Sequence, residues 1–306
     1  MNIAVTGATG FVGRYIVANL LAGGHRVVAW RRPTSDVSGF PENLTPDALR
    51  WIDGGLGDDR AARELVRDAD AVVHAAVDRP GEGFIGAEGD VAEFVDRNVT
   101  GSVRLMERAR EAGVGRFVFL SSGAVHDEIL PDRPLDETHP NWSKSHYGAS
   151  KAAVEAFAID YGLSGRLAAC ALRPCGVYGL ARPASESKWF GLVRDVAAGR
   201  PVECRRGAKV VHAADVARAV AILLTAEAPA VAGLAFNCCD RYISDHEVAT
   251  IARRLSGASG TIEGEPGRPK NVIVTDRIRS LGMTFGGTGL LERTVGELLA
   301  ADPFPG

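Results

Sequence analysis

Three glycines near the start of the chain constrain its fold more than any other feature. Residues 2–6 (NIAVT) predict a short strand, and the segment that follows reads TGATGFVG and leads into a helical pattern. Gly7 permits a tight turn, Gly10 lets the backbone approach a pyrophosphate, and Gly13 lets the helix pack closely on the strand. The N-terminus of that helix offers free N–H groups and partial positive charge to phosphates. The pattern predicts a dinucleotide-binding unit, with a glycine-rich packing turn as the alternative.

The first 175 residues alternate apolar, β-branched runs with helical patterns. Continuous apolar strands separated by helices indicate a parallel sheet covered on both faces. Right-handed crossovers then give a doubly wound α/β sheet, the Rossmann fold. We expect strands at 2–6, 26–30, 50–53, 71–76, 116–122 and 166–173, and helices at 11–22, 58–68, 89–112 and 143–161.

Two regions break this alternation. Residues 78–89 hold four glycines and one proline, and they predict a mobile loop at the carboxyl edge of the sheet, where such folds bind ligands. The C-terminal part has short helices and isolated strands such as 233–238. We therefore expect a dinucleotide-binding domain of residues 1–178 plus 206–230, and a smaller C-terminal substrate-binding lobe of residues 179–205 and 231–306.

Composition excludes several classes of protein. The 306 residues are 46% hydrophobic and 24% charged, with a formal net charge of −3, which is ordinary for a globular protein and gives no basic footprint for nucleic acid. No apolar run reaches the roughly 18–20 residues of a membrane span, and no polybasic membrane patch or signal-peptide pattern is present. The five cysteines lack metal-ligand spacing. We expect a cytoplasmic protein with reduced thiols, without a metal, nucleic-acid or membrane partner.

The end of the second strand carries the signal for cofactor choice. An acidic residue there would accept hydrogen bonds from a ribose 2′-hydroxyl and select NAD, whereas arginines pair with a 2′-phosphate. This chain has Arg31 followed by Arg32. The residues favour NADP over NAD, with a pair of solvated surface charges as the alternative.

Tyr147 and Lys151 form the clearest catalytic pattern. Residues four apart in a helix lie on one face. A lysine ammonium beside a phenol favours the phenolate, so the tyrosine can exchange a proton near neutral pH. Ser122 ends the preceding strand, 25 residues before Tyr147, and its hydroxyl can hold the substrate oxygen.

At this point the chain resembles the extended short-chain dehydrogenases/reductases of the nucleotide-sugar epimerase/dehydratase type. The resemblance covers residues 1 to about 220. Its motifs occur in family order: TGATGFVG (6–13), HAA (74–76), NVTG (98–101), SSGAV (121–125), YGASK (147–151), LRPCGVYG (172–179) and VHAADVARAV (211–220).

The resemblance implies a role for each matching residue. Tyr147 is the proton donor and acceptor, Ser122 orients the reacting oxygen, Lys151 binds the nicotinamide ribose, and Asn98 helps to place Lys151 through backbone and water. The implied cofactor contacts are Gly7, Thr9, Gly10, Phe11, Val12, Gly13, Arg31, Arg32, Leu56, Ala75, Ala76, Tyr147, Lys151, Pro174 and Cys175.

The chain also departs from that family. Dehydratases place an Asp–Glu pair after the active-site Ser/Thr, where this chain has Gly123 and Ala124. Nucleotide-sugar members place a sugar-nucleotide-binding Asn where Gly176 stands, and an Arg aligned with Ala208. The expected substrate contacts are Val77, His126, Gly176, Lys188 and Arg268. His126 replaces a family tyrosine and could equally fill a loop, and the cations could be solvated surface charges.

The resemblance implies an NAD(P)-dependent oxidoreductase or epimerase that transfers a hydride at a secondary alcohol or ketone of a sugar or nucleotide-sugar. The alternatives are an NADPH-dependent ketoreductase of a non-nucleotide substrate and a non-catalytic dinucleotide sensor. A homodimer is also expected, because the family pairs the helices 89–112 and 143–161 across a two-fold axis. The second helix would present small and apolar residues there: Ala152, Ala153, Ala156, Phe157 and Ala158.

Overall fold

The computed structural model describes residues 1–40, 45, 47–78, 86 and 88–301. It divides into two compact units. The first comprises residues 1–174, 216–238 and 274–283, and the second comprises residues 175–215, 239–273 and 284–306. Of the expected loop 78–89, residues 79–85 and 87 lie outside the described part of the chain.

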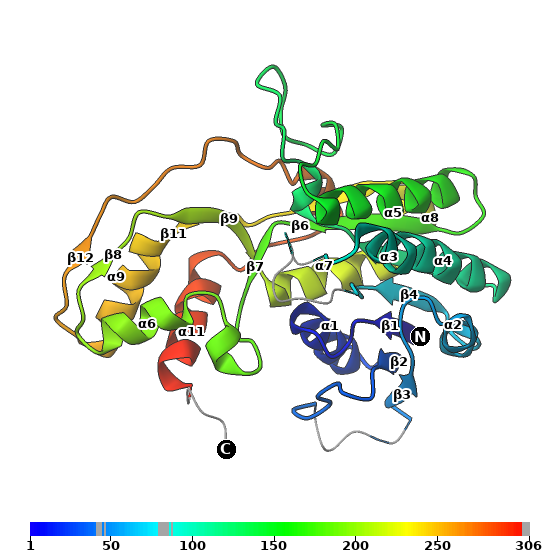
Figure 1. Ribbon diagram of the computed structural model, residues 1–306, viewed down its shortest axis with the longest axis horizontal. Helices are drawn as coiled ribbons and strands as arrows, with labels where there is room; N and C mark the ends of the chain where they lie inside the picture. Colours follow the sequence, from blue (N-terminus) through cyan, green and yellow to red (C-terminus); the bar gives the residue numbers. More distant parts are fainter. Residues whose placement is uncertain (41–44, 46, 79–85, 87, 302–306) are drawn as a thin grey trace. The chain divides into compact units, whose positions relative to one another are not determined.

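The first unit is built on a seven-stranded parallel sheet, which confirms the predicted doubly wound fold (Figure 1). The strand order is β10-β6-β5-β4-β1-β2-β3. The central strands β4 and β5 are buried along their whole length, as both faces of a parallel sheet are covered. The strands are β1 (Asn2–Thr6), β2 (Arg26–Arg31), β3 (Leu49–Asp53), β4 (Ala71–His74), β5 (Arg116–Leu120), β6 (Ala169–Pro174) and β10 (Ala235–Cys238).

Helices cover both faces of this sheet. On one face, α2 (Asp59–Val66), α4 (Gly101–Glu111) and α5 (His146–Leu163) bury Leu65, Leu105, Met106, Val154 and Ala158 against the strands. On the other, α1 (Phe11–Ala22) lies beside α7 (Ala213–Thr225), where the Asn19 amide donates to the Ala217 oxygen at 3.5 Å. The short helices α3 (Val91–Val95), α8 (Ala228–Val231) and α10 (Asp276–Ser280) complete this unit.

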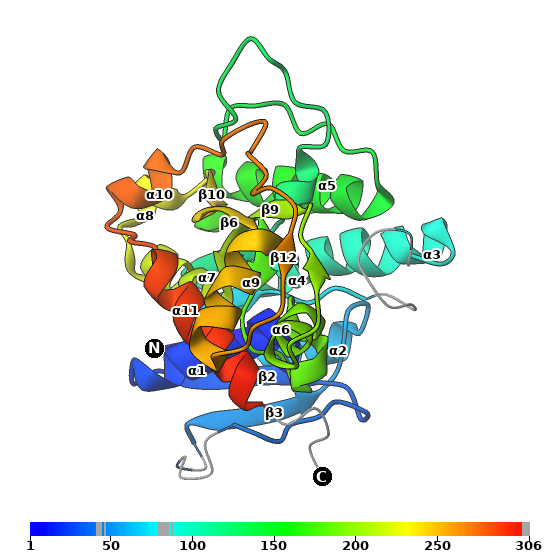
Figure 2. The ribbon, with the colours of Figure 1, turned by 90° about the vertical axis from the view of Figure 1, so that its left-hand side faces the viewer.

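The second unit has its own core. Its helices α6 (Phe190–Ala197), α9 (Asp245–Ser256) and α11 (Gly287–Ala300) pack against one another (Figure 2). Its strands form a three-stranded sheet in the order β11-β9-β7 and a two-stranded sheet of β12 and β8. These strands are β7 (Gly176–Tyr178), β8 (Val202–Glu203), β9 (Gly207–His212), β11 (Arg241–Ser244) and β12 (Ile262–Glu263).

The observed division differs from the expected one in three strands and in the segment 274–283, which carries α10 and belongs to the first unit instead of the smaller lobe. β7 is expected in the dinucleotide-binding domain, but it pairs with β9 in the second unit. β10 is expected in the smaller lobe, but it pairs with β6 as the edge of the main sheet. β9 is expected in the dinucleotide-binding domain, but it pairs with β7 and β11 in the second unit. Strand pairing over long sequence separations decides the assignment of all three strands, and strand patterns in the sequence carry no information about the partner.

The expected helix 89–112 is interrupted. It consists of α3, a π-helical turn at Asp96–Thr100 and α4. Single π-turns inserted into α-helices occur frequently at functional sites, and this one carries Asn98.

Candidate active site

The glycine turn after β1 has the geometry that the sequence predicts. Gly7 has φ +71°, and a Cβ there would lie 2.7 Å from the Ala75 carbonyl carbon. A Cβ on Gly13 would lie 2.0 Å from the Gly7 oxygen. Any side chain at these positions would push α1 and the segment after β4 off the turn. A Cβ on Gly10 would have the Gly7 oxygen, at 3.3 Å, as its nearest neighbour among the described residues.

The N-terminus of α1 fits a dinucleotide phosphate. Within the described part of the chain, no side chain caps this helix at Gly10, and its first turn carries no acidic residue. The amides of Phe11, Val12 and Gly13 therefore keep their hydrogen-bonding capacity for an anion. The Thr9 main-chain oxygen accepts a hydrogen bond from the Arg14 Nε at 3.1 Å, which helps to fix the backbone of the turn.

The two arginines after β2 differ in their surroundings. Arg31 Nε forms an ion pair with Asp53 at the end of β3, at 2.9 Å. Arg32 is exposed, and its backbone N–H donates to Ser35 Oγ at 3.0 Å. A 2′-phosphate at Arg31 would have to share the guanidinium with the Asp53 carboxylate.

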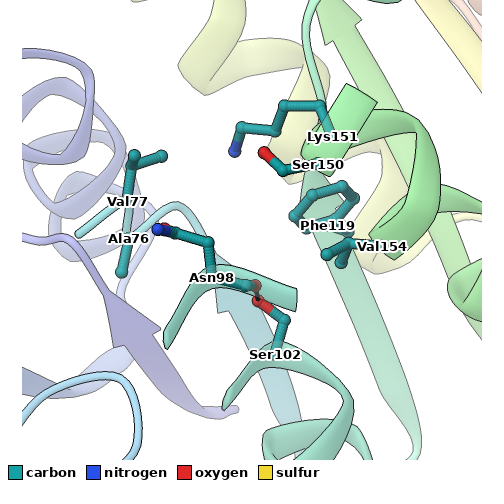
Figure 3. A pocket seen from close by; sticks show the side chains of 8 residues that line it. All are labelled: Ala76, Val77, Asn98, Ser102, Phe119, Ser150, Lys151 and Val154. Carbon is teal, nitrogen blue, oxygen red and sulfur yellow. Dashed lines mark hydrogen bonds between the residues drawn. The ribbon is translucent and has the colours of Figure 1, made fainter. Parts of the chain in front are cut away.

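Lys151 is a buried lysine at the centre of the candidate site. Its ammonium group is buried, donates to the Leu120 oxygen at 2.8 Å, and lies 4.8 Å from the centre of the Phe119 ring and 5.9 Å from that of Tyr147. Burial lowers the pKa of Lys151 to about 7. Figure 3 shows Lys151 on α5 lining a small pocket together with Asn98 and Ser102.

Tyr147 stands in the first turn of α5. Ser145 caps this helix by accepting from the Gly148 N–H at 3.1 Å, and the Tyr147 N–H donates to Glu88 at 3.3 Å. A Cβ on Gly148 would lie 2.2 Å from the Ala124 oxygen. Glycine at this position therefore lets the turn that carries Tyr147 press against the segment directly after Ser122.

Ser122 caps the short 3-10 helix at Gly123–Val125. Its hydroxyl oxygen accepts from the Ala124 N–H at 3.1 Å. Because this contact uses a lone pair, the hydroxyl proton is left to donate to a substrate oxygen.

Asn98 acts on the backbone near the cofactor turn. Its side-chain amide donates to the Asp78 oxygen at 2.7 Å and accepts from the Asp78 N–H at 2.8 Å. These bonds fix the chain directly after Val77. Ala76 and Val77 line the same pocket as Lys151.

Sequence reasoning missed a buried polar chain beneath this pocket. Thr6 Oγ1 lies 2.7 Å from His74 Nδ1, and His74 Nε2 lies 2.8 Å from Ser102 Oγ. His74 stands in the HAA segment, from which only the two alanines were given roles. A histidine that ends a fully apolar strand was the available signal.

The His126 ring is held by contacts within the protein. Its Nδ1 lies 3.1 Å from the Pro140 oxygen and its Nε2 lies 3.1 Å from Arg173 Nη1. Burial and the Arg173 charge lower the pKa of His126 to about 4. Both ring nitrogens are thus engaged within the protein, as in the loop-filling alternative, and neither is left for the substrate contact that was expected.

Arg173 and Glu155 form the buried ion pair behind this histidine. Arg173 Nε lies 3.0 Å from Glu155 Oε2, and their side chains are 3% and 0% exposed. Burial alone would raise the pKa of Glu155, but the bonds from Arg173 bring its pKa below the usual value. Glu155 follows Lys151 by one turn of α5, so the pair anchors the helix that carries Tyr147.

The remaining cofactor and substrate predictions are divided between the two units. In the first, Leu56 is partly buried beside Gly101, and Pro174 ends β6 and is buried. In the second, Cys175 directly precedes β7 and Gly176 begins it. Lys188 is partly buried, and Arg268 is exposed. These assignments stay predictions.

Two further findings concern the described residues only. No cluster of three or more His, Cys, Asp or Glu side chains is arranged to hold a metal ion there. Nor does any helix in those ranges combine the length and apolarity that crossing a bilayer requires.

Comparison with known proteins identifies the family. The model of the NAD-dependent epimerase/dehydratase family matches residues 3–239. The chain belongs to this family. The family match includes the glycine turn, Ser122, Tyr147 and Lys151, and it confirms the resemblance stated from the motifs.

The relatives include sugar-nucleotide enzymes. A UDP-glucose 4-epimerase of Streptomyces lividans is 30% identical over 277 residues, covering 83% of this chain and 80% of the relative. One from Neisseria meningitidis is 33% identical over 172 residues, where the match spans 52% of this chain and only 48% of that protein. Among solved structures, MoeE5 in complex with UDP-glucuronic acid and NAD is 27% identical, with a TM-score of 0.76 over 98% of this chain and 99% of that one.

Proposed function

We propose that the protein is an NAD(P)-dependent epimerase that oxidises and re-reduces a secondary alcohol of a nucleotide-sugar. The observation that carries the proposal is the Tyr147–Lys151 pair on α5, with the Lys151 ammonium 5.9 Å from the centre of the tyrosine ring. It is supported by the glycine turn that fits a dinucleotide and by the relatives, which include UDP-glucose 4-epimerases.

The proposed chemistry assigns one task to each side chain. Tyr147 Oη takes the proton of the substrate hydroxyl as the carbon loses its hydride, and the Ser122 hydroxyl donates to the resulting ketone oxygen. The Lys151 ammonium favours the phenolate form of Tyr147. When bound at the glycine turn, NAD(P) would supply the hydride acceptor and donor. Tyr147 would give the proton back to the ketone oxygen when the hydride is restored on the opposite face, which yields the epimer.

Dehydration is the less favoured reaction of this site. The relatives also include dTDP-glucose 4,6-dehydratases. Water loss needs an acid and a base beside the reacting carbon. Gly123 and Ala124 follow Ser122 here and supply neither group.

Net reduction by NADPH is the second candidate, and Arg31 is the observation that favours it. A guanidinium at the end of β2 suits a 2′-phosphate, and we propose NADP as the preferred cofactor. The Thermus thermophilus UDP-glucose 4-epimerase and MoeE5, two structural relatives, were each solved with NAD, so the preference for NADP is proposed for this chain alone.

Lys188 is the side chain we propose for an anionic group of the substrate. Its ammonium lies 5.3 Å from the centre of the Trp189 ring and 3.7 Å from the point where a Cβ on Gly176 would stand. Burial lowers the pKa of Lys188.

Trp189 has φ +68°, which is unusual for a bulky residue, and its indole donates to Asp245 at 2.9 Å. The backbone that carries Lys188 is therefore held in a strained, fixed turn. Arg268 and Gly176 are the other proposed substrate contacts in this unit.

We also propose a homodimer through α3, α4 and α5. Val91, Val95 and Phe157 are each 40–42% exposed, and Ala156 is exposed beside Phe157. Ala158, which was expected on this surface, is 0% exposed because it faces the sheet.

A cytoplasmic location remains part of the proposal, as all five cysteines are free thiols.

The test is an assay of purified protein with UDP-glucose, dTDP-glucose and UDP-glucuronic acid, each with NAD and with NADP. An epimerase converts the sugar without net reduction of the cofactor, and the cofactor remains bound through dialysis. Net oxidation of NADPH in proportion to product would support the ketoreductase instead. Cofactor binding without turnover of any sugar nucleotide or ketone would favour the non-catalytic sensor.

A further inference from the structure

His74 is a buried histidine that the proposed mechanism does not use. It is 0% exposed and ends β4. Its partners Thr6 and Ser102 come from β1 and α4 and are 0% and 2% exposed. A buried imidazole with two hydroxyl partners has few allowed proton arrangements, so the direction of each hydrogen bond can be worked out.

The proton positions follow from Ser102. Ser102 Oγ makes a short hydrogen bond to the Asn98 main-chain oxygen, and a carbonyl oxygen only accepts, so the single hydroxyl proton is used there. His74 Nε2, 2.8 Å from Ser102 Oγ, must then carry a proton and donate. In a neutral ring Nδ1 is left as an acceptor for the Thr6 hydroxyl at 2.7 Å.

The other end of the chain is equally determined. Thr6 Oγ1, having donated its proton to His74, accepts from the Ala76 N–H at 3.1 Å. One directed chain therefore runs from the Ala76 amide through Thr6, His74 and Ser102 to the Asn98 oxygen. A second proton on His74 would reverse the contact with Thr6 and leave the threonine proton without this acceptor. Burial and the nearby Lys151 charge lower the pKa of His74 to about 3, in agreement with a neutral ring.

The two ends of this chain lie at the two sides of the proposed site. Ala76 stands in the segment that contacts the glycine turn, where a Cβ on Gly7 would lie 2.8 Å from the Ala76 nitrogen. Asn98 stands in the π-turn and lines the pocket of Lys151 (Figure 3). A π-turn lacks the regular i to i−4 bonding of a helix, so an additional bond to its carbonyl helps to fix its shape.

We propose that His74 is a positioning residue, held neutral as its Nε2–H tautomer, that aligns the Asn98 π-turn with the cofactor-side backbone at Ala76. It touches neither substrate nor cofactor. The inference rests on the proposed function only for its effect on turnover, since the tautomer and the bond directions are properties of the protein alone.

The direct test is 15N NMR of the histidine side chains in the cofactor-free wild-type protein, with His74→Gln used to assign the signal. We expect the His74 ring to show a protonated Nε2 and an unprotonated Nδ1 without change from pH 5 to pH 8. A protonated Nδ1, or titration of His74 within this range, would overturn the proposal whether or not the protein is an epimerase.

The functional test uses matched variants at the two ends of the hydrogen-bond chain. Ser102→Ala removes the bond to the Asn98 oxygen, and we expect kcat to fall about 10–100-fold, the scale of a small misplacement of reacting groups, with the NADPH dissociation constant within about threefold. Thr6→Val removes the acceptor for Ala76 N–H, and we expect weaker NADPH binding with a smaller effect on kcat.

Two controls separate positioning from folding and from the proposed activity. Thr294 makes the same type of buried bond, donating to the Leu290 oxygen four residues earlier at 2.9 Å, and Thr294→Val should cost stability but leave kcat unchanged. A kcat of Ser102→Ala equal to wild type in folded protein would overturn the positioning role. If Tyr147→Phe also retains full turnover, the proposed function fails instead, while the NMR result still decides the tautomer.

Discussion

Arg31 Nε and the Asp53 carboxylate form an ion pair at 2.9 Å that joins the carboxyl ends of β2 and β3. The guanidinium is therefore held in place before any cofactor arrives. We expect Arg31→Ala to weaken NADP binding about 10–100-fold, because a charge-assisted hydrogen bond to the phosphate is lost, and to change NAD binding little. Fluorescence titration with NADPH and NADH measures both.

Asp53→Asn serves as the matched variant for this cofactor prediction. It removes the negative charge that competes for Arg31, and the ratio of NADP to NAD affinity should rise. A ratio that stays the same in both variants would show that Arg31 does not contact the 2′-phosphate.

Tyr147→Phe should abolish turnover while leaving the fold intact. The variant lacks only the phenolic oxygen, and removing one general acid/base costs roughly 10²–10⁴ in rate. Steady-state assays on any accepted sugar nucleotide test the prediction, with cofactor affinity expected to stay within a few-fold. Wild-type turnover in this variant would rule out the proposed proton transfer.

Lys188→Gln should raise the KM for an anionic substrate about 10–100-fold, the effect of losing a charge-assisted contact, with a smaller change in kcat. Lys188→Arg keeps the charge and should recover part of the affinity. The exposed Lys270 provides the control, as Lys270→Gln removes the same charge from the surface. Equal effects of the two Gln variants would mean that long-range charge, rather than contact at Lys188, is responsible.

Lys151 makes the stability of the cofactor-free protein depend on pH. Its folded-state pKa of about 7 lies below the ordinary 10.5, so between these values the unfolded chain binds the proton and the folded protein does not. The free energy of unfolding contributed by Lys151 therefore rises with pH across this window. We expect Lys151→Met to be more stable than wild type near pH 7. The margin, which is the difference between their free energies of unfolding, should narrow toward pH 10.

Chemical denaturation at several pH values measures that margin. Lys270→Met is the control, because an exposed lysine has no such burial cost and its margin should stay constant. A margin for Lys151→Met that is independent of pH would mean that the ammonium is solvated in the folded protein.

Phe157→Glu and Ala156→Glu should dissociate the proposed dimer, because a desolvated carboxylate at a two-fold contact meets its own copy. Light scattering at micromolar concentration should give twice the 32.3 kDa of the chain for wild type and the monomer mass for the variants. Val272 is 70% exposed in the second unit, and Val272→Glu should leave the dimer intact. A wild-type mass of one chain would contradict the proposal directly.

Local patterns predicted the elements that position the candidate site. The Gly7, Gly10 and Gly13 spacing gave the turn between β1 and α1, because a tight turn and a close helix–strand contact impose glycine at fixed intervals. The four-residue spacing of Tyr147 and Lys151 gave one face of α5, because helical periodicity is a local property. The shapes of these segments follow from the residues within them.

Contacts between distant segments were decided by the tertiary structure alone. Pairing of β10 with β6 brings Phe236 beside Leu172, and nothing near residue 236 in the sequence specifies that neighbour. Likewise His126 is withdrawn from solvent by Arg173 and Pro140, and His74 obtains its tautomer from Thr6 and Ser102. A side chain's role depends on desolvation and on the hydrogen-bonding capacity of its neighbours. Folding supplies both by joining residues that are distant in the sequence, such as Thr6 and His74, which lie 68 positions apart. The sequence by itself determined the motifs and the order in which they occur.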